Sequence, residues 1–207
     1  MNSALRLPLV TTPEQTSSLL ALQAAFAQAC NALAPIVKQT GCWNRVALHH
    51  MTYRMLRAAF PGLGSQMICN AIYSVSRACR LAFQHPESPF NLTRLAGKPL
   101  PLLRFTDTCP VYFDRHTLSV RQGQLSMFTL DGRMHFQLTI KPEDEIRFQR
   151  DKLREIVLSR DASNVFQLSF VFAAEAQPSL PELPAADESD VAVPGKLPEY
   201  VLIEENP

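Results

Sequence analysis

The chain has 207 residues, of which 46% are hydrophobic and 19% are charged, and its formal net charge is +1. This balance favours a globular chain of one domain, or of one domain with an appendage, over an intrinsically disordered one. The apolar stretches fall short of the roughly 20 residues of a membrane-spanning helix, and the first residues do not resemble a signal peptide. We therefore expect a cytoplasmic protein.

The two parts of the chain carry opposite charge. Residues 1–174 hold 19 Lys and Arg against 11 Asp and Glu, a balance of +8, whereas residues 175–207 hold one Lys against eight acids, a balance of −7. Most of the basic residues are Arg, whose planar guanidinium pairs with phosphate and stacks on bases. An Arg-rich body with an acidic tail is typical of nucleic-acid-binding proteins, although a solvated surface can have the same composition.

The sequence predicts a first strand in residues 1–12 and a helix that begins at Pro13. Thr12 is the predicted N-cap, and Gln15 stands where a capping box needs it. We expect this helix to end at about Ala34, because Pro35 follows. Its predicted apolar stripe is Leu19, Leu22, Phe26, Cys30 and Leu33.

Two further helices are predicted, one from Asn44 to Phe60 and one from the N-cap Ser65 to about Phe83. The buried stripe of the latter would be Ile68, Ile72, Val75, Cys79 and Ala82. Its opposite face carries Asn70, Tyr73, Arg77, Arg80 and Gln84, and the helix before it carries His50, Arg54 and Arg57 on one face. The 72 residues between Glu14 and Glu87 contain no acid, which is unusual for solvated helices because these normally mix both charges.

After the proline-containing loop of residues 86–101 the apolar period changes from 3.6 to 2. This pattern predicts strands at 110–114, 117–121, 124–130 and 133–140, then a short charged helix that runs into a strand, and a last strand at 164–174. The sequence "LSMFTLDGRMHFQLTI" predicts a hairpin with a type I′ turn at Asp131-Gly132. The core candidates of this hairpin are mostly Met127, Phe128, Met134, Phe136 and Leu138.

Polar side chains of the hairpin would point away from the core. Ser126, Arg133 and His135 are the outward residues, and Arg115, Arg121 and Lys141 lie near them in the sequence. Either this is an ordinary sheet with a solvated face or it is a surface that meets a negatively charged ligand.

The chemistry of most enzyme classes is missing from the sequence. There is no GxSxG elbow, no GxxxxGK[ST] loop and no GxGxxG after a strand, and the acids stand at predicted turns or at a helix start. The cysteines and histidines show no metal-ligand spacing, so the thiols are expected to be buried and no metal or cofactor is expected. These residues therefore make no catalytic constellation, and we do not expect an enzyme.

From residue 175 onward proline, alanine and acids dominate, and we expect this tail to lack regular structure. The segment "LPEYVLIEE" is the exception, since it could dock as a strand or act as a short linear motif. A protein partner such as a nuclease subunit or a related effector could be bound through residues 198–205.

The order of elements predicts an α+β fold. The lone first strand is expected to return past the three helices and join the later antiparallel strands, which gives a small β-barrel or curved sheet with a helical insertion.

Three stretches together resemble a known family. "LPLVTTPEQTSSLLALQAAFAQACNALAPI", "LHHMTYRMLRAAFPGLGSQMICNAIYSVSRACR" and "VYFDRHTLSVRQGQLSMFTLDGRMHFQLTI" resemble, in this order, the N-terminal region of the TnpB proteins. These are transposon-encoded RNA-guided nucleases related to type V CRISPR effectors. The resemblance runs from about residue 5 to 172.

The resemblance implies a wedge domain, an oligonucleotide-binding (OB)-like β-barrel made of residues 1–12 and 86–174, with a helical recognition lobe at 13–85. In that family these parts hold the guide RNA and the guide–target hybrid. The family then continues into a RuvC nuclease, opened by a "GvDlGi" motif, whereas this sequence passes into the acidic tail of residues 175–207. We therefore expect a protein without nuclease activity that binds guide-type RNA or an RNA–DNA hybrid, as a regulator or accessory subunit.

Two alternatives stay open: a protein-interaction module that dimerises or binds a nuclease or effector, and an inactive remnant of the transposon protein. The expected nucleic-acid contacts are His50, Arg54, Arg57, Asn70, Tyr73, Arg77, Arg80, Arg115, Arg121, Arg133, His135 and Lys141.

Overall fold

The structure is a computed structural model, and it describes residues 3–114, 116–121, 123–161, 163–172 and 197–204. The helices are α1 Pro13–Thr40, α2 Arg45–Ala59, α3 Ser65–Phe83, α4 Leu92–Leu95 and α5 Pro142–Arg150. The strands are β1 Ser3–Pro8, β2 Leu102–Phe105, β3 Val111–Phe113, β4 Leu118–Arg121, β5 Gln124–Thr129, β6 Gly132–Gln137, β7 Leu153–Arg160, β8 Phe166–Phe172 and β9 Val201–Glu204.

Helix α1 begins as predicted and ends later than predicted. The Thr12 side chain accepts from the Gln15 N–H at 3.2 Å and Gln15 Oε1 accepts from the Thr12 N–H at 2.9 Å, which confirms the capping box. The end predicted at Ala34 is wrong, because the helix continues through Pro35 to Thr40. Pro35 is exposed while Val37 is buried at 2%, so continued burial of the apolar stripe offsets the hydrogen bond that proline cannot make.

The whole predicted stripe of α1 is buried, mostly at 1% exposure or less. By length and composition α1 is apolar enough to cross a membrane, although half of its most apolar window is buried inside the protein. A core helix passes the same test, so this property does not separate the two cases.

Helices α2 and α3 have nearly the predicted bounds. Asn44 caps α2, since its Oδ1 accepts from the N–H groups of Val46 and Ala47 at 3.0 and 3.1 Å. Gly64, and not Ser65, is the N-cap of α3. Every residue of the predicted α3 stripe has 1% exposure or less, which confirms the face that enters the core.

The strands form three antiparallel sheets. One has the order β1-β8-β7-β3, the second is β4-β5-β6, and the third is the pair β2-β9. Leu5 of β1 lies opposite Phe170 of β8, so the predicted return of the first strand is confirmed. The α+β class is confirmed as well, but among the described strands none of the sheets closes into the predicted barrel.

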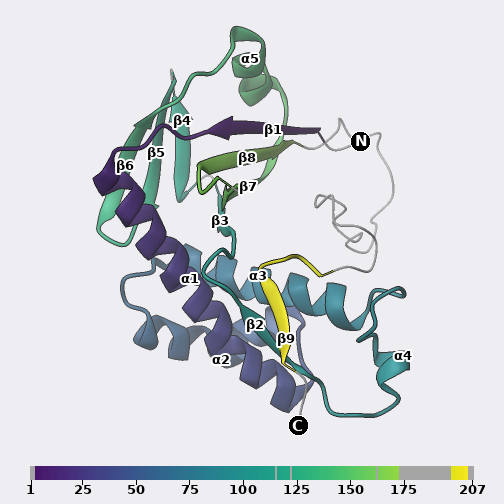
Figure 1. Cartoon of the computed structure of the whole chain (residues 1–207). Coiled ribbons are helices and arrows are strands. Elements are labelled where there is room, and N and C mark those ends of the chain that lie inside the picture. The colour runs from purple at the N-terminus through teal and green to yellow at the C-terminus, as the bar shows by residue number, and fades with distance from the viewer. Residues whose placement is uncertain (1–2, 115, 122, 162, 173–196, 205–207) are drawn as a thin grey trace.

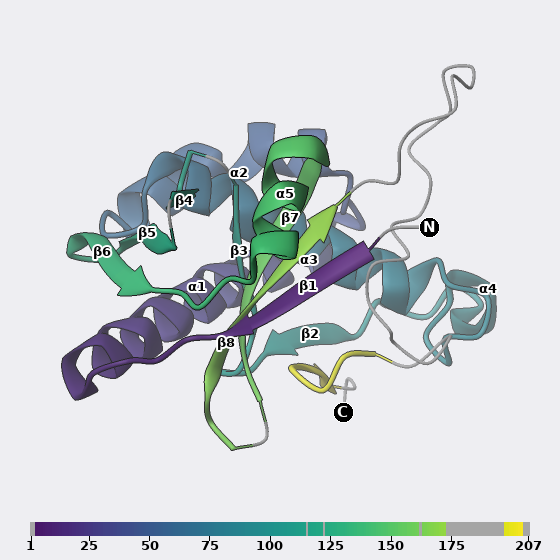
Figure 2. The same ribbon diagram turned by 90° about the horizontal axis from the view of Figure 1, so that it is seen from above.

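Helices cover both faces of the sheet that contains β1 (Figures 1 and 2). On one face the Tyr73 ring of α3 packs edge-on against Tyr112 of β3, with 5.6 Å between centroids. On the other face Phe148 of α5 packs edge-on against Phe170 and Phe172 at 4.9 and 5.3 Å. One core includes residues of α1, α3, this sheet and the apolar face of β4-β5-β6, and α5 packs on the other face of the sheet from α3.

The hairpin of β5 and β6 exists, but its turn is not the predicted one. Thr129 pairs with Gly132, so the loop residues are Leu130 and Asp131. Gly132 takes a φ of +107°, whereas Asp131 is not among the described residues with positive φ. The type I′ prediction is therefore wrong, because neither Leu130 nor Asp131 has the positive φ that this turn needs at both central residues, and Gly132, with positive φ, is the first residue of β6.

The tail contains one described strand, and it lies in the segment "LPEYVLIEE". Residues 201–204 form β9 and pair with β2, so this segment docks as a strand, one of the two possibilities given for it, while the general prediction that residues 175–207 lack regular structure does not hold there. Val201 is buried, at 5% exposure. Strand β2 was not predicted, and residues 173–196 lie outside the described part of the chain.

Candidate nucleic-acid interface

One face of the sheet β4-β5-β6 combines basic, amide, hydroxyl and aromatic side chains without any acid. We call it the acid-free face. It consists of Ser119, Arg121, Gln124, Ser126, Phe128, Arg133, His135 and Gln137. Strand pleating places these residues together, because successive side chains alternate between faces. The opposite face is apolar, with Leu118, Leu125, Met127 and Phe136 all at 2% exposure or less.

An arginine–phenylalanine pair lies on the acid-free face. Arg133 and Phe128 are directly opposite in the register, and the guanidinium carbon lies 4.2 Å from the centroid of the Phe128 ring. Arg133 also donates to Ser126 Oγ at 3.2 Å and to the His116 carbonyl at 3.1 Å. These contacts orient the guanidinium over the ring, yet both residues stay exposed, Phe128 at 38%.

The remaining polar groups of the acid-free face extend from this pair across the sheet. His135 lies opposite Ser126, and Gln124 lies between Arg121 and Gln137 in the register. Arg121, His135 and both glutamines are exposed. The face therefore presents positive charge, hydrogen-bond donors and an aromatic ring together. Proteins use these groups to contact the backbone and the bases of single nucleic-acid strands.

Three of the predicted contact residues thus meet on one surface, namely Arg121, Arg133 and His135. Arg115 belongs to the residues outside the described part of the chain. Lys141 is exposed at the N-cap position of α5, where its Nζ lies 3.9 Å from Glu143.

The predicted residues of α2 form a separate surface. His50 and Arg54 are exposed on α2, and the apolar residues Met51 and Met55 beside them are exposed too, at 49% and 43%. Arg57 is half-buried and donates to the Leu63 carbonyl, so it holds the α2–α3 connection.

The prediction for α3 is wrong for two of its residues. Asn70 and Arg77 are buried at 8% and 6% exposure. Asn70 donates to the Tyr112 carbonyl at 2.7 Å, and Arg77 forms an ion pair with Glu155 of β7 at 3.3 Å. Both residues attach α3 to the sheet, because α3 packs on α1, α2 and β3 and has little surface left for solvent.

Tyr73 and Arg80 complete the predicted set. Tyr73 is half-buried between the Tyr112 ring and the Arg45 guanidinium, which lies 5.3 Å from the Tyr73 centroid. This position differs from that of an open stacking platform. Arg80 is exposed in the last turn of α3.

Sequence reasoning missed the most informative residue of the interface, Phe128, which it placed in the core. The signal was present, because Leu125 and Met127 are buried and the alternation then directs Phe128 outward with Gln124 and Ser126. The prediction of a core position rested on the hydrophobicity of Phe128 and not on the alternation of side chains along β5. The same alternation along β6 directs the Gln137 side chain outward.

The thiols are structural in character. Cys30, Cys79 and Cys109 are buried, while Cys42 and Cys69 are half-buried. Burial raises the pKa of the Cys79 thiol to about 12 and also raises the pKa of Cys30 well above its usual value. Within the described residues no group of three or more His, Cys, Asp or Glu side chains is placed to hold a metal ion.

Comparison with known proteins adds no family to this description. No protein-family model matches the chain, and no curated protein matches it either.

Proposed function

We propose that this protein binds guide-type RNA or an RNA–DNA hybrid through the acid-free face and does not cut it. The observation that carries the proposal is the pair of Arg133 and Phe128, an exposed ring with an oriented guanidinium on a sheet face that has no acid. A carboxylate on this face would repel phosphate, so its absence among eight described side chains is the favourable electrostatic condition.

The geometry supports a division of labour on this surface. Arg121 and Arg133 supply charge for phosphates, and Phe128 with the Arg133 guanidinium supplies planes on which bases stack. His135, Gln124 and Gln137 supply hydrogen bonds. The amide and imidazole groups can read base edges or ribose hydroxyls, which distinguish RNA from DNA.

The relation to the TnpB wedge belongs to the same proposal. Two observations support it: the first strand joins a sheet formed by residues after 110, and the three long helices stand between them in sequence. An inserted helical lobe on a wedge has this chain order. We propose that the protein uses the wedge-like part for binding, as a regulator or accessory subunit.

Protein binding is the second candidate function, and the surface of α2 favours it. Exposed Met51 and Met55 lie one turn apart beside Arg54 and His50. Methionine adapts to varied apolar partners, so this surface suits a protein better than a phosphate backbone.

Gel-shift titration with labelled guide-type RNA at low and high salt tests the proposal. We expect binding that weakens steeply as salt increases, and Phe128→Ala should weaken it roughly 5- to 150-fold, since a base–aromatic stack contributes about 1–3 kcal/mol. Val165→Ala is the matched control, because Val165 is a similarly exposed apolar residue at 42% on another part of the chain. It should leave affinity unchanged.

Two results would contradict the proposal. The first is an RNA affinity that changes neither with salt concentration nor with the Phe128→Ala substitution. The second is the appearance of shorter RNA products when Mg²⁺ is added, which would show cleavage.

A further inference from the structure

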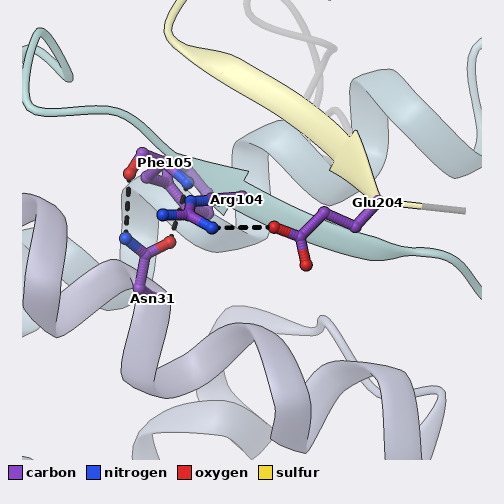
Figure 3. A network of polar contacts seen from close by, with 4 residues as sticks. All are labelled: Asn31, Arg104, Phe105 and Glu204. Carbon is purple, nitrogen blue, oxygen red and sulfur yellow. Dashed lines mark hydrogen bonds and ion pairs between the residues drawn. The ribbon is translucent and has the colours of Figure 1, made fainter.

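Strand β9 lies along one edge of β2 and pairs with it (Figure 3). We call this edge of β2, from Leu102 to Thr106, the β2 slot. Asn31 of α1 occupies the other side of β2: its Nδ2 donates to the Phe105 carbonyl at 2.8 Å, and its Oδ1 accepts from the Phe105 N–H at 2.7 Å. The side-chain amide thus replaces a neighbouring strand residue. In an antiparallel strand the groups of alternate residues point to opposite sides, so Leu102, Arg104 and Thr106 must direct theirs toward β9.

The contacts of β9 define what this slot recognises. Thr106 N–H donates to the Tyr200 carbonyl at 2.9 Å, and the register places Leu202 opposite Arg104 and Val201 opposite Phe105. Val201 is buried, and Arg104 pairs with Glu204 at 3.0 Å. The slot therefore takes an extended segment with an apolar residue and, three residues later, an acid.

Strand β9 is held by the burial of Val201, by the packing of Ile203 and by contacts at the surface. It has four residues and one neighbour among the described strands, and the Arg104–Glu204 pair is 64% and 46% exposed. An exposed ion pair adds little stability, and a short strand of this kind opens locally at low cost. Once β9 leaves, β2 has an open edge whose backbone groups need a new partner.

Enough residues separate β8 from β9 for the strand to reach another chain. The 24 residues 173–196 lie outside the described part of the chain, and any 24 residues span at most roughly 80 Å. A compact domain of 207 residues has a radius of gyration of only about 17 Å. The strand can therefore reach the β2 slot of another copy.

We propose that two copies of this chain exchange β9, so that each β2 slot is completed by Val201–Glu204 of the other copy. The occupant is chemically matched by definition, since the same four residues fit the slot within one chain. Because identical contacts form within and between chains, protein concentration decides between the closed monomer and the exchanged dimer. This inference does not depend on nucleic-acid binding.

A cysteine trap in the full-length protein tests the exchange. Arg104 and Leu202 lie directly opposite each other and both are exposed, so cysteines there can form a disulfide. One chain carries Arg104→Cys and the other Leu202→Cys, and the two are incubated together, oxidised and separated without reductant. We expect a linked species of twice the 23.2 kDa chain in the mixture, increasing with protein concentration.

The controls separate exchange from chance oxidation of native thiols. Each variant is oxidised alone, and Leu202→Cys is also mixed with Arg94→Cys, an exposed position on α4 outside the β2 slot. None of these should give the linked species. If the Arg104→Cys and Leu202→Cys mixture gives no more linked dimer than the controls at the highest concentration, the strand stays within its own chain and the proposal is wrong.

Discussion

At the scale of single residues, two arginines for which the sequence predicts the same role lie in opposite environments. Arg133 is exposed and lies over an aromatic ring, whereas Arg77 is buried against Glu155. Sequence placed both among the nucleic-acid contacts, because the helical and strand periods give the face of a residue but not what covers that face. Burial of α3 on two sides decides the role of Arg77.

Replacement of Arg77 by methionine should therefore affect folding and not binding. The change removes the ion pair between Arg77 and the half-buried Glu155. We therefore expect the free energy of unfolding to decrease by about 3 kcal/mol in urea titration. Arg80→Met on the same helix is exposed and should change stability little. An Arg77→Met protein with wild-type stability and reduced RNA affinity would contradict the structural role.

The thiols should differ in reactivity in the native state. Alkylation needs the thiolate, and a raised pKa lowers the thiolate fraction at a given pH. At pH 8 Cys79, with a pKa of about 12, should stay unlabelled by iodoacetamide together with the buried Cys30 and Cys109. Mass spectrometry should find label on Cys42 and, more slowly, on the half-buried Cys69, whose pKa burial also raises, and on all five thiols in urea. Native labelling of Cys79 would contradict the placement of α3.

At the scale of elements, sequence patterns correctly predicted the features that depend on neighbouring residues. The caps at Thr12 and Asn44 and the apolar stripes of α1 and α3 were predictable, as were the strands of the hairpin region. Pro35 misled the prediction of the α1 end, because the gain from burying Val37 comes from tertiary packing. The sequence allowed the segment of β9 to dock as a strand but did not give its partner, since β2 lies about 100 residues away.

Gly132 offers a test of the observed turn. Its φ of +107° is unfavourable for any side chain, while a Cβ there would meet no atom within 4 Å. Gly132→Ala should therefore lower the free energy of unfolding by about 1–2 kcal/mol through backbone strain alone. Gly62→Ala serves as control, because its Cβ would make only an ordinary contact of 3.7 Å with Leu130. Equal unfolding midpoints for the two variants would contradict the described turn.

At the scale of the whole molecule, the acid-free face depends on connections that are short in sequence, whereas the rest of the fold depends on pairings between distant segments. The acid-free face is built by two short hairpin connections, β4 to β5 and β5 to β6, so sequence predicted three of its residues. The framework depends on distant pairings, such as β1 with β8, and on the burial of Asn70 and Arg77 between layers. The predicted contact residues that turned out to be buried, Asn70 and Arg77, therefore lie on α3, which packs against several neighbouring elements.

The salt dependence of RNA affinity tests the central claim most directly. Fluorescence anisotropy gives the slope of log affinity against log salt, and for single strands each neutralised phosphate contributes about −0.7. If Arg121 and Arg133 contact phosphates, the Arg121→Ala/Arg133→Ala protein should lose about 1.4 from the magnitude of this slope. Arg94→Ala/Arg154→Ala, which removes two exposed arginines elsewhere, should keep the wild-type slope. Equal slopes in the two double variants, or no salt dependence in the wild type, would contradict RNA binding by the acid-free face.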